Sequence, residues 1–120
     1  PSKEMADWAP SFLPEGYIES KRTDLGTLVE ITYDCKDLDM WITFSYLRLA
    51  EGSGFDLDNE HHVVTEISVQ GMDGYLYTAS EDKLNAVVWF NETLRYGFLL
   101  SSRLPPDTLL EIAESVNTKS

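Results

Sequence analysis

The chain has 120 residues, of which 42% are hydrophobic and 12% aromatic, a composition that predicts a single folded domain and excludes a disordered polar chain. Nine Lys and Arg against 21 Asp and Glu give a formal net charge of −12 at pH 7. This charge repels phosphate backbones and anionic membrane surfaces, so we expect no nucleic-acid partner.

The chain has one cysteine, Cys35, which excludes an intramolecular disulfide. Because it alternates with Val29, Ile31 and Tyr33, we interpret it as a buried thiol of a strand rather than a reactive nucleophile. No stretch of 18 apolar residues is present, so we expect no membrane span within this chain. It starts at Pro1 without a methionine, and we therefore expect a processed protein or a piece of a longer one.

The first part of the chain predicts an extended lead-in followed by strands. Residues 1–16 mix prolines with large apolar side chains, and residues before a proline favour extended conformations. Residues 17–23 predict a short strand, and Asp24-Leu25-Gly26 supplies a turn. Alternation of apolar and polar residues over 29–35 then predicts a half-buried strand.

The next strand is predicted from about Met40 to Leu49. Its inward side chains are Met40, Ile42, Phe44 and Tyr46, after which Leu47 and Leu49 are apolar on the opposite parity. A bulge or a change of burial near Tyr46 would explain this switch. Residues 51–62, with two glycines, four acids and no Lys or Arg, predict a long exposed loop.

Four further strands are predicted before the C-terminus. Residues 63–70 alternate, with Val63, Thr65, Ile67 and Val69 inward, and a strand ending at Ala79 follows, with Gly71 and Gly74 marking a tight connection. The last two strands, 84–90 and 94–101, are apolar at nearly every position. This pattern is typical of strands covered on both faces, so we expect them to be central.

Residues 104–117 predict a C-terminal helix. Pro105-Pro106-Asp107 suits a first turn, and Leu109, Ile112, Ala113 and Val116 recur at helical spacing. The expected fold is therefore α+β, an antiparallel and mostly meander sheet of about seven strands with one C-terminal helix on one face. We expect one domain over residues 1–120, comprising the lead-in 1–16, the sheet 17–103 and the helix 104–117.

Several short motifs occur in a characteristic order along nearly the whole chain, from Trp8 to Val116. They are Trp-x-Pro-x-x-Leu-Pro-Glu-Gly-Tyr (8–17), Gly71-x-x-Gly74, Ala-Val-Val-Trp-Phe (86–90), Tyr96-Gly97-Phe98 and the closing apolar pattern of residues 104–116. In this order the chain resembles the family called domain of unknown function 4367. Members of that family more often have a Ser or Thr cap where this chain has Pro105.

The resemblance implies a bacterial domain outside the cytoplasmic membrane, tethered by an upstream membrane-spanning helix that is absent from this chain. Some members follow a cytoplasmic segment similar to anti-sigma factors, so an anti-sigma-type regulator is one implied role. The family has no established activity and no assigned catalytic residues. It therefore implies a location rather than a reaction.

The nearest approach to a metal site is His61-His62 beside Asp56, Asp58 and Glu60. Adjacent residues of a strand point to opposite faces, so neighbouring histidines seldom bind one ion. The calcium-loop template also fails, because it requires a glycine where His61 stands and a glutamate where Ile67 stands. We interpret this segment as a solvated acidic loop with no bound metal.

No combination of residues predicts catalysis. A serine nucleophile needs a histidine base, yet both histidines belong to one loop, and no Gly-x-Ser-x-Gly turn is present. With 21 Asp and Glu in the chain, pairs of carboxylates arise by chance, so no single pair indicates a catalytic site. We therefore expect no enzyme and no cofactor.

The candidate binding surface consists of four aromatic residues predicted on strands, Trp41, Tyr75, Tyr77 and Trp89. A single helix covers one face of a sheet and leaves the other to be covered by something else. One interpretation is that the lead-in, with Trp8, Phe12 and Leu13, folds over that face as ordinary core. The other is a groove for a peptide, lipid or cell-wall fragment.

Two functions follow from this surface. The first is a non-enzymatic extracytoplasmic sensing or protein-interaction module, which binds a partner by its sheet or an edge strand. The second is a carrier-like domain that holds an apolar ligand, such as a lipid, a lipoprotein or a cell-wall fragment, on the sheet face. A carrier requires an apolar cavity of several hundred Å³, whereas an interaction module requires only an exposed patch or edge.

Overall fold

The computed structural model describes residues 6–49, 62–79 and 84–118, with the backbone alone for His62. The described residues form nine strands and one helix. Their bounds are β1 (Trp8–Pro10), β2 (Ile18–Asp24), β3 (Leu28–Cys35), β4 (Met40–Arg48), β5 (His62–Val69), β6 (Met72–Ala79), β7 (Asn85–Asn91), β8 (Tyr96–Ser102), α1 (Pro106–Glu114) and β9 (Val116–Thr118).

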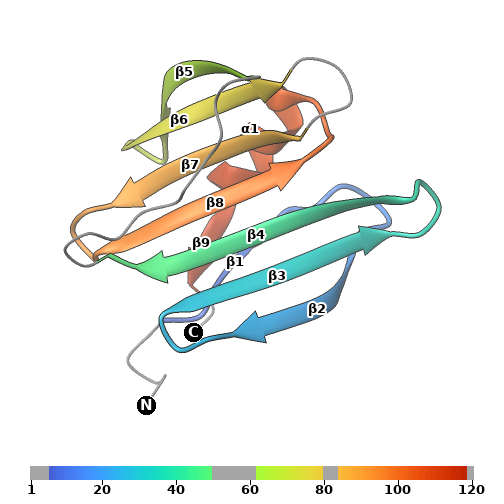
Figure 1. The fold of residues 1–120 in the computed structure, drawn as a ribbon, viewed down its shortest axis with the longest axis horizontal. Helices are drawn as coiled ribbons and strands as arrows, with labels where there is room; N and C mark the ends of the chain where they lie inside the picture. Colours follow the sequence, from blue (N-terminus) through green and yellow to red (C-terminus); the bar gives the residue numbers. More distant parts are fainter. Residues whose placement is uncertain (1–5, 50–61, 80–83, 119–120) are drawn as a thin grey trace.

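Seven of the strands form one antiparallel sheet in the order β2-β3-β4-β8-β7-β6-β5 (Figure 1). Strands β2 to β4 form one meander and β5 to β8 form another, and the two halves join where β8 pairs with β4. The α+β class, the mostly meander sheet and the C-terminal helix are confirmed. The connection from β4 to β5 is the departure from a meander, because it leads from the middle of the sheet to its far edge.

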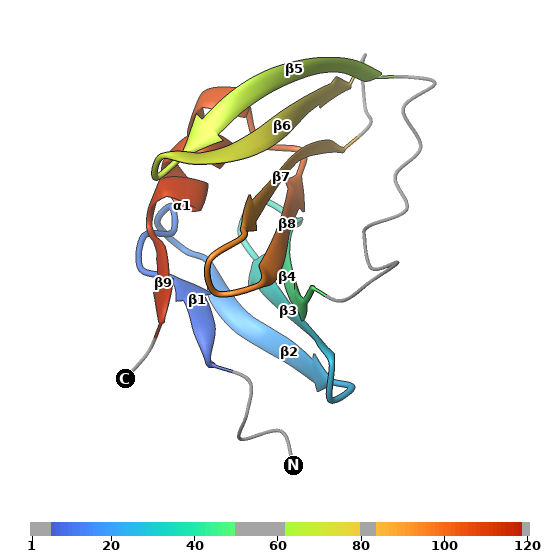
Figure 2. The same cartoon turned by 90° about the vertical axis from the view of Figure 1, so that its left-hand side faces the viewer.

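The sheet is strongly curved, and α1 lies on its concave side together with a small second sheet (Figure 2). This second sheet pairs β1 with β9, with Trp8 opposite Thr118 and Pro10 opposite Val116. The lead-in therefore packs on the same side of the sheet as the helix. The interpretation that it covers the opposite face is wrong, because Trp8 packs against Phe98, which belongs to the helix side.

The core fills the space between the concave face, α1 and β1. Trp89, Phe44 and Phe98 are all completely buried, and their rings stack at centroid distances of 5.1 to 6.5 Å. The ring of Trp8 meets Phe98 edge-on at 4.9 Å. Burial of such large apolar groups supplies the main driving force for this fold.

The predicted alternation in β3 is confirmed, since Val29, Ile31, Tyr33 and Cys35 are all buried. In β4, pairing with β3 is continuous from Met40 to Leu47, so no bulge interrupts the strand. Leu47 instead points to the opposite face, where it is half-buried. The switch near Tyr46 is therefore a change of burial.

Strand β5 differs from its prediction in burial. Val69 is buried and Ile67 is half-buried, but Val63 and Thr65 are exposed although they share the same parity. The reason is that β5 is an edge strand, and its first half extends beyond the cover that α1 provides on the concave side (Figure 2).

The connection between β5 and β6 is formed by Gln70 and Gly71, whose φ angles of 54° and 80° are those of a tight hairpin turn. Gly74 lies inside β6 rather than in the turn. It is opposite Trp89, and a Cβ there would lie 2.5 Å from the carbonyl oxygen of Val88. A side chain is thus excluded by close packing of two strands.

Helix α1 is shorter than predicted, because it ends at Glu114 and Val116 belongs to β9. Leu109, Ile112 and Ala113 face the core as expected, and Val116 is buried from its position in the strand. At the helix start, Pro105 makes no side-chain cap hydrogen bond. Among the described residues, no helix has the length and hydropathy needed to cross a membrane.

Candidate binding surface

The face of the main sheet that points away from α1, here called the outer face, is defined by strand register. One row of directly paired residues crosses all seven strands from Thr23 to Glu66. Its members in order are Thr23, Glu30, Ser45, Leu99, Val88, Tyr75 and Glu66. Because paired residues of an antiparallel sheet share a face, all seven side chains lie on the outer face.

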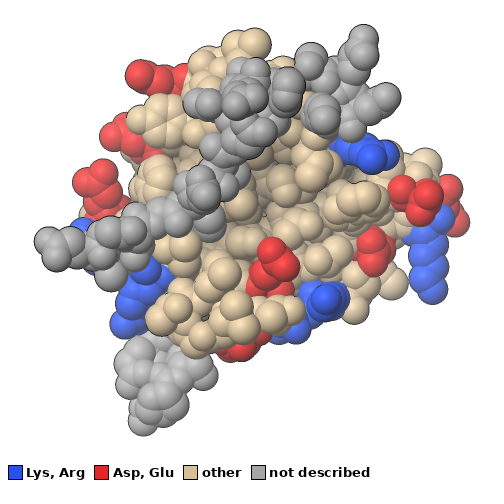
Figure 3. Space-filling model, viewed as in Figure 1, with Lys and Arg blue, Asp and Glu red and all other residues tan. Residues whose placement is uncertain are grey.

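The centre of the outer face is uncharged. The residues of this parity in β4, β8 and β7 are Trp41, Thr43, Ser45, Leu47, Gly97, Leu99, Ser101, Ala86, Val88 and Phe90. No charged side chain is among them, although the chain as a whole has a formal charge of −12. Figure 3, which views this face, shows tan residues over much of the described surface, with acidic and basic side chains among and around them. These strand positions therefore contribute no carboxylate to the outer face of a strongly acidic chain.

Three of the four predicted site residues lie on the outer face. Tyr75 and Tyr77 belong to β6, and Trp41 lies near the start of β4, three strands away. Trp41 and Tyr75 each keep 39% of their surface exposed, and Tyr77 is half-buried. These aromatics therefore mark two sides of one surface, and their strands are roughly 14 Å apart across the sheet at the usual strand spacing.

Trp89 is not part of this surface, because its side chain is completely buried on the helix side. The sequence of β7 is apolar at consecutive positions, so its pattern does not reveal which parity faces the helix. The register settles it, since Trp89 pairs with Phe98 and Gly74 in the core.

The exposed apolar residue Val64 extends the outer face to β5 and was not singled out from the sequence. It is 41% exposed and pairs with Tyr77. The alternation of β5 had placed the opposite parity inward, and this left Val64 as an isolated apolar residue on the other side. An apolar residue at an outward position of a predicted strand is the signal that could have identified it.

Trp41 is held in place from two directions. The hydroxyl group of Ser102 donates a hydrogen bond of 3.0 Å to the carbonyl oxygen of Trp41. The guanidinium carbon of Arg103 lies 5.6 Å from the centroid of the indole ring, which is within cation–π range. The hydrogen bond thus anchors the backbone of Trp41, and the cation–π contact restrains its partly exposed ring.

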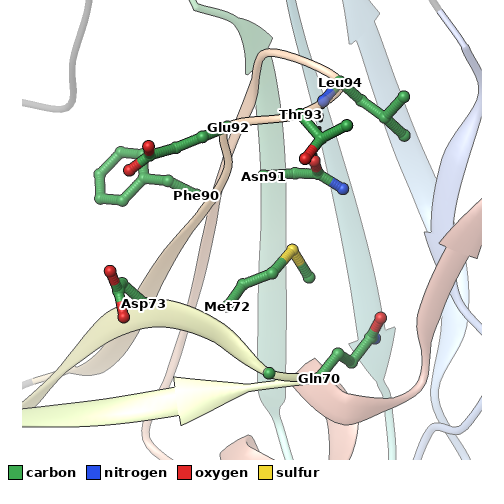
Figure 4. Close-up of a pocket in the computed structure, with 9 residues that line it drawn as sticks. Gln70, Met72, Asp73, Phe90, Asn91, Glu92, Thr93 and Leu94 are labelled. Carbon is green, nitrogen blue, oxygen red and sulfur yellow. Dashed lines mark hydrogen bonds between the residues drawn. The ribbon is translucent and has the colours of Figure 1, made fainter.

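A groove of about 640 Å³ lies beside the turn of β5–β6 and the hairpin of β7–β8 (Figure 4). Its lining residues are Gln70, Gly71, Met72, Asp73, Phe90, Asn91, Glu92, Thr93 and Leu94. In Figure 4 the Met72 side chain points toward the hairpin, whereas Gln70 points away from the groove. The groove combines apolar side chains with two carboxylates and has no basic residue in its lining.

A second groove of about 640 Å³ lies beside α1 and is lined by Phe12, Asp107, Leu110, Glu111 and Glu114. A smaller one of about 180 Å³ lies near Trp41, at the start of β4. The linings of these two grooves each contain carboxylates and apolar side chains.

Potential metal ligands are dispersed over the described residues. Among them, no group of three or more His, Cys, Asp or Glu side chains is placed to hold a metal ion. The acidic segment with Asp56, Asp58, Glu60 and His61 lies outside the described residues, and His62 is described only as the first residue of β5.

Three tyrosines and one arginine near the lead-in and β2 have shifted pKa values. Burial, reinforced by the carboxylate of Glu19, raises the pKa of Tyr33 to about 12. Burial likewise raises the pKa values of Tyr17 and Tyr46. The hydrogen bond to Glu19 raises the pKa of Arg22, whose guanidinium group also pairs with Asp7 at 3.3 Å. All of these groups join the lead-in and β2 to the core.

Comparison with curated proteins found no match to this chain. A family model matches residues 7–116, which include all of the main sheet and the helix. The match extends over almost the same residues as the motifs from Trp8 to Val116. The chain belongs to the family described as Domain of unknown function (DUF4367).

Proposed function

We propose that this chain is a non-enzymatic, extracytoplasmic sensing or protein-interaction module of a membrane-anchored bacterial protein, and that the outer face binds its partner. The observation that carries the proposal is the uncharged centre of this face. In a domain with a formal charge of −12, ten outward positions on β4, β8 and β7 carry no charge; of these, Trp41 is exposed, whereas Ser45, Ala86 and Val88 are buried. The exposed apolar residues at the two sides of this face, Trp41 on one and Tyr75 and Val64 on the other, are of the kind found at protein interaction sites.

The partly exposed aromatics support the same role. Trp41 and Tyr75 offer large contact areas with few rotatable bonds, which lowers the entropy lost on binding. The cation–π contact with Arg103 further restrains Trp41. A partner would find the Trp41 ring already restrained.

The alternative is a carrier-like domain for an apolar ligand. A carrier needs an enclosed apolar cavity, but the space between sheet and helix is filled by Trp89, Phe44 and Phe98, each completely buried. The two larger grooves lie on the surface and are lined partly by carboxylates. The filled core favours the interaction module.

Site-specific photocrosslinking in living cells tests this proposal. The full-length protein carries a photoreactive amino acid at Tyr75 on the outer face or, as the matched control, at Glu111 on the exposed side of α1. We expect a discrete protein adduct from position 75, much less from position 111, and loss of the adduct after Trp41→Ser. Lipid or cell-wall adducts in place of protein would support the carrier, and equal yields from the two positions would contradict the role of the outer face.

The location is tested separately by labelling intact cells with an amine reagent that does not cross membranes. Lys21 and Lys36 are exposed and report on accessibility from outside. Labelling of both before lysis is expected, and labelling only after lysis would place the domain inside the cell.

A further inference from the structure

The two edges of the main sheet are built differently. At one edge, β2 has a register shift between Glu19 and Lys21, and it carries four charged side chains among its seven residues. Bulges and charges of this kind prevent an edge strand from pairing with another chain. This edge is protected.

At the other edge, β5 has no register shift and only one carboxylate. It runs for eight residues, from His62 to Val69, in continuous register with β6. It contains no proline and no Lys or Arg, and Glu66 is its only acid. Among the described residues, no strand pairs with its free side.

The hairpin turn identifies the backbone groups at this free side. In a two-residue turn the flanking residues, Val69 and Met72, exchange hydrogen bonds with each other. Alternate residues of β5 therefore bond to β6, and the residues between them direct their N–H and C=O groups outward. The outward set is His62, Val64, Glu66 and Ser68.

The side chains beside this edge define what it could accept. Val63 and Val64 are 69% and 41% exposed, and next to Val64 lies Tyr77 of the outer face. The described residues of 62–79 and 84–94 contain no Lys or Arg, whereas Glu66, Asp73 and Glu92 are acidic. The edge thus combines free backbone groups, apolar contacts and negative charge.

We propose that the free edge of β5 binds an extended, cationic segment of a partner protein, which adds to the main sheet as a further antiparallel strand. This inference rests on the proposed function and assigns the interaction to one edge and one class of partner. Backbone hydrogen bonds to His62, Val64, Glu66 and Ser68 provide affinity without regard to sequence. The partner's side chains provide specificity. A β-branched or aromatic residue is favoured opposite Val64, and Lys or Arg is favoured opposite Glu66.

A second copy of the chain is the other candidate for this edge. Two copies each carry a formal charge of −12, so their mutual repulsion opposes pairing. Pairing centred on Glu66 would also place two carboxylates directly opposite each other, which destabilises a sheet. A cationic segment meets neither obstacle.

The test uses an acetylated and amidated eight-residue peptide of valine and threonine with two lysines, and binding is followed by fluorescence anisotropy. A second peptide is N-methylated at alternate residues, which keeps its charge but removes the donors needed for pairing. A third has glutamates in place of the lysines. We expect the first to bind, the N-methylated peptide to lose at least about 10-fold in affinity, and the glutamate peptide to show no binding.

Two variants locate the site on the protein. Val64→Pro removes an outward N–H at a position where an edge strand tolerates proline, and should abolish peptide binding. Glu66→Lys should weaken binding by about 5-fold, while Glu30→Lys, the same charge change on the outer face of β3, should weaken it much less. Proper folding of each variant is checked by circular dichroism.

Equal affinity for the N-methylated peptide would overturn the inference, as would equal losses for Glu66→Lys and Glu30→Lys. Dimers in analytical ultracentrifugation that vanish in Val64→Pro would assign the edge to a second copy and also overturn it. If the adduct from Tyr75 forms unchanged in Val64→Pro, this inference fails while the proposed function stands. If position 75 gives no adduct at all, the proposed function fails.

Discussion

The side-chain amide of Gln70 donates a hydrogen bond of 2.7 Å to the carbonyl oxygen of Val116, just beyond the end of α1. The same nitrogen lies 2.9 Å from the carbonyl oxygen of Glu114 and 3.3 Å from that of Ala113. The backbone N–H of Gln70 also donates to the carboxylate of Glu114. The β5–β6 turn therefore caps the C-terminal end of the helix and fixes β5 against it.

Replacement of Gln70 by Ala should lower the free energy of unfolding by about 1 kcal/mol, because partly buried carbonyl groups at and just beyond the helix end lose their donor. Chemical denaturation measures the change. The φ of 54° at this position also favours Asn or Gly, so Gln70→Asn is the matched variant that relieves the backbone but shortens the amide. A Gln70→Asn protein as stable as the parent would contradict the capping role.

Gly74→Ala should destabilise the fold by about 2–3 kcal/mol, since the added Cβ would meet the carbonyl oxygen of Val88 at 2.5 Å and the Cβ of Trp89 at 2.9 Å. Gly71→Ala is the control, because nothing lies within 4 Å of its added Cβ and only the φ of 80° opposes it. We expect about 1 kcal/mol there. Thermal or denaturant unfolding decides, and a larger loss at position 71 would be inconsistent with close strand packing at Gly74.

Truncation of the lead-in tryptophan, Trp8→Ala, should cost about 3–5 kcal/mol, because the ring packs edge-on against Phe98 and Tyr96 in the core. Phe12→Ala in the same lead-in should cost less than about 1 kcal/mol, since Phe12 is 41% exposed. Urea unfolding of both variants provides the measurement. Similar losses for the two would mean that β1 is not part of the core.

Stability should depend on pH through Tyr33, whose pKa is about 12 in the folded chain against an ordinary value of 10.0. Between these values the folded state holds the proton that the unfolded state has released, so the free energy of unfolding should be constant just below pH 10 and fall from pH 10 to 12. Tyr33→Phe should fall less steeply over this window. Equal slopes for the two proteins would show that Tyr33 does not contribute.

The sequence predicted the elements whose pattern depends on local periodicity. The alternation of Val29, Ile31, Tyr33 and Cys35 predicted both the strand and its buried side, because one face of β3 is packed and the other is not. The stripe of α1 was predicted for the same reason. The prediction of a further helical turn through Val116 was wrong, because Val116 belongs to β9 and is buried equally well from a strand.

What could not be predicted depends on contacts between distant residues. The pairing of β1 with β9 joins segments about 110 residues apart, and no local sequence pattern predicts this pairing. The side of Trp89 was ambiguous because β7 is apolar on both faces. The edge position of β5 arises from the connection after β4, and it decides both the exposure of Val63 and the free backbone groups.

The central claim is that a protein partner binds to the outer face and adds to the edge of β5. Amide hydrogen exchange by mass spectrometry, on the full-length protein free and crosslinked to its partner through position 75, tests it most directly. We predict slower exchange in β5, at the amides of Val64, Glu66 and Ser68, and no change in β2 at the opposite edge. Unchanged exchange in β5 together with protection of β2 or α1 would contradict the account.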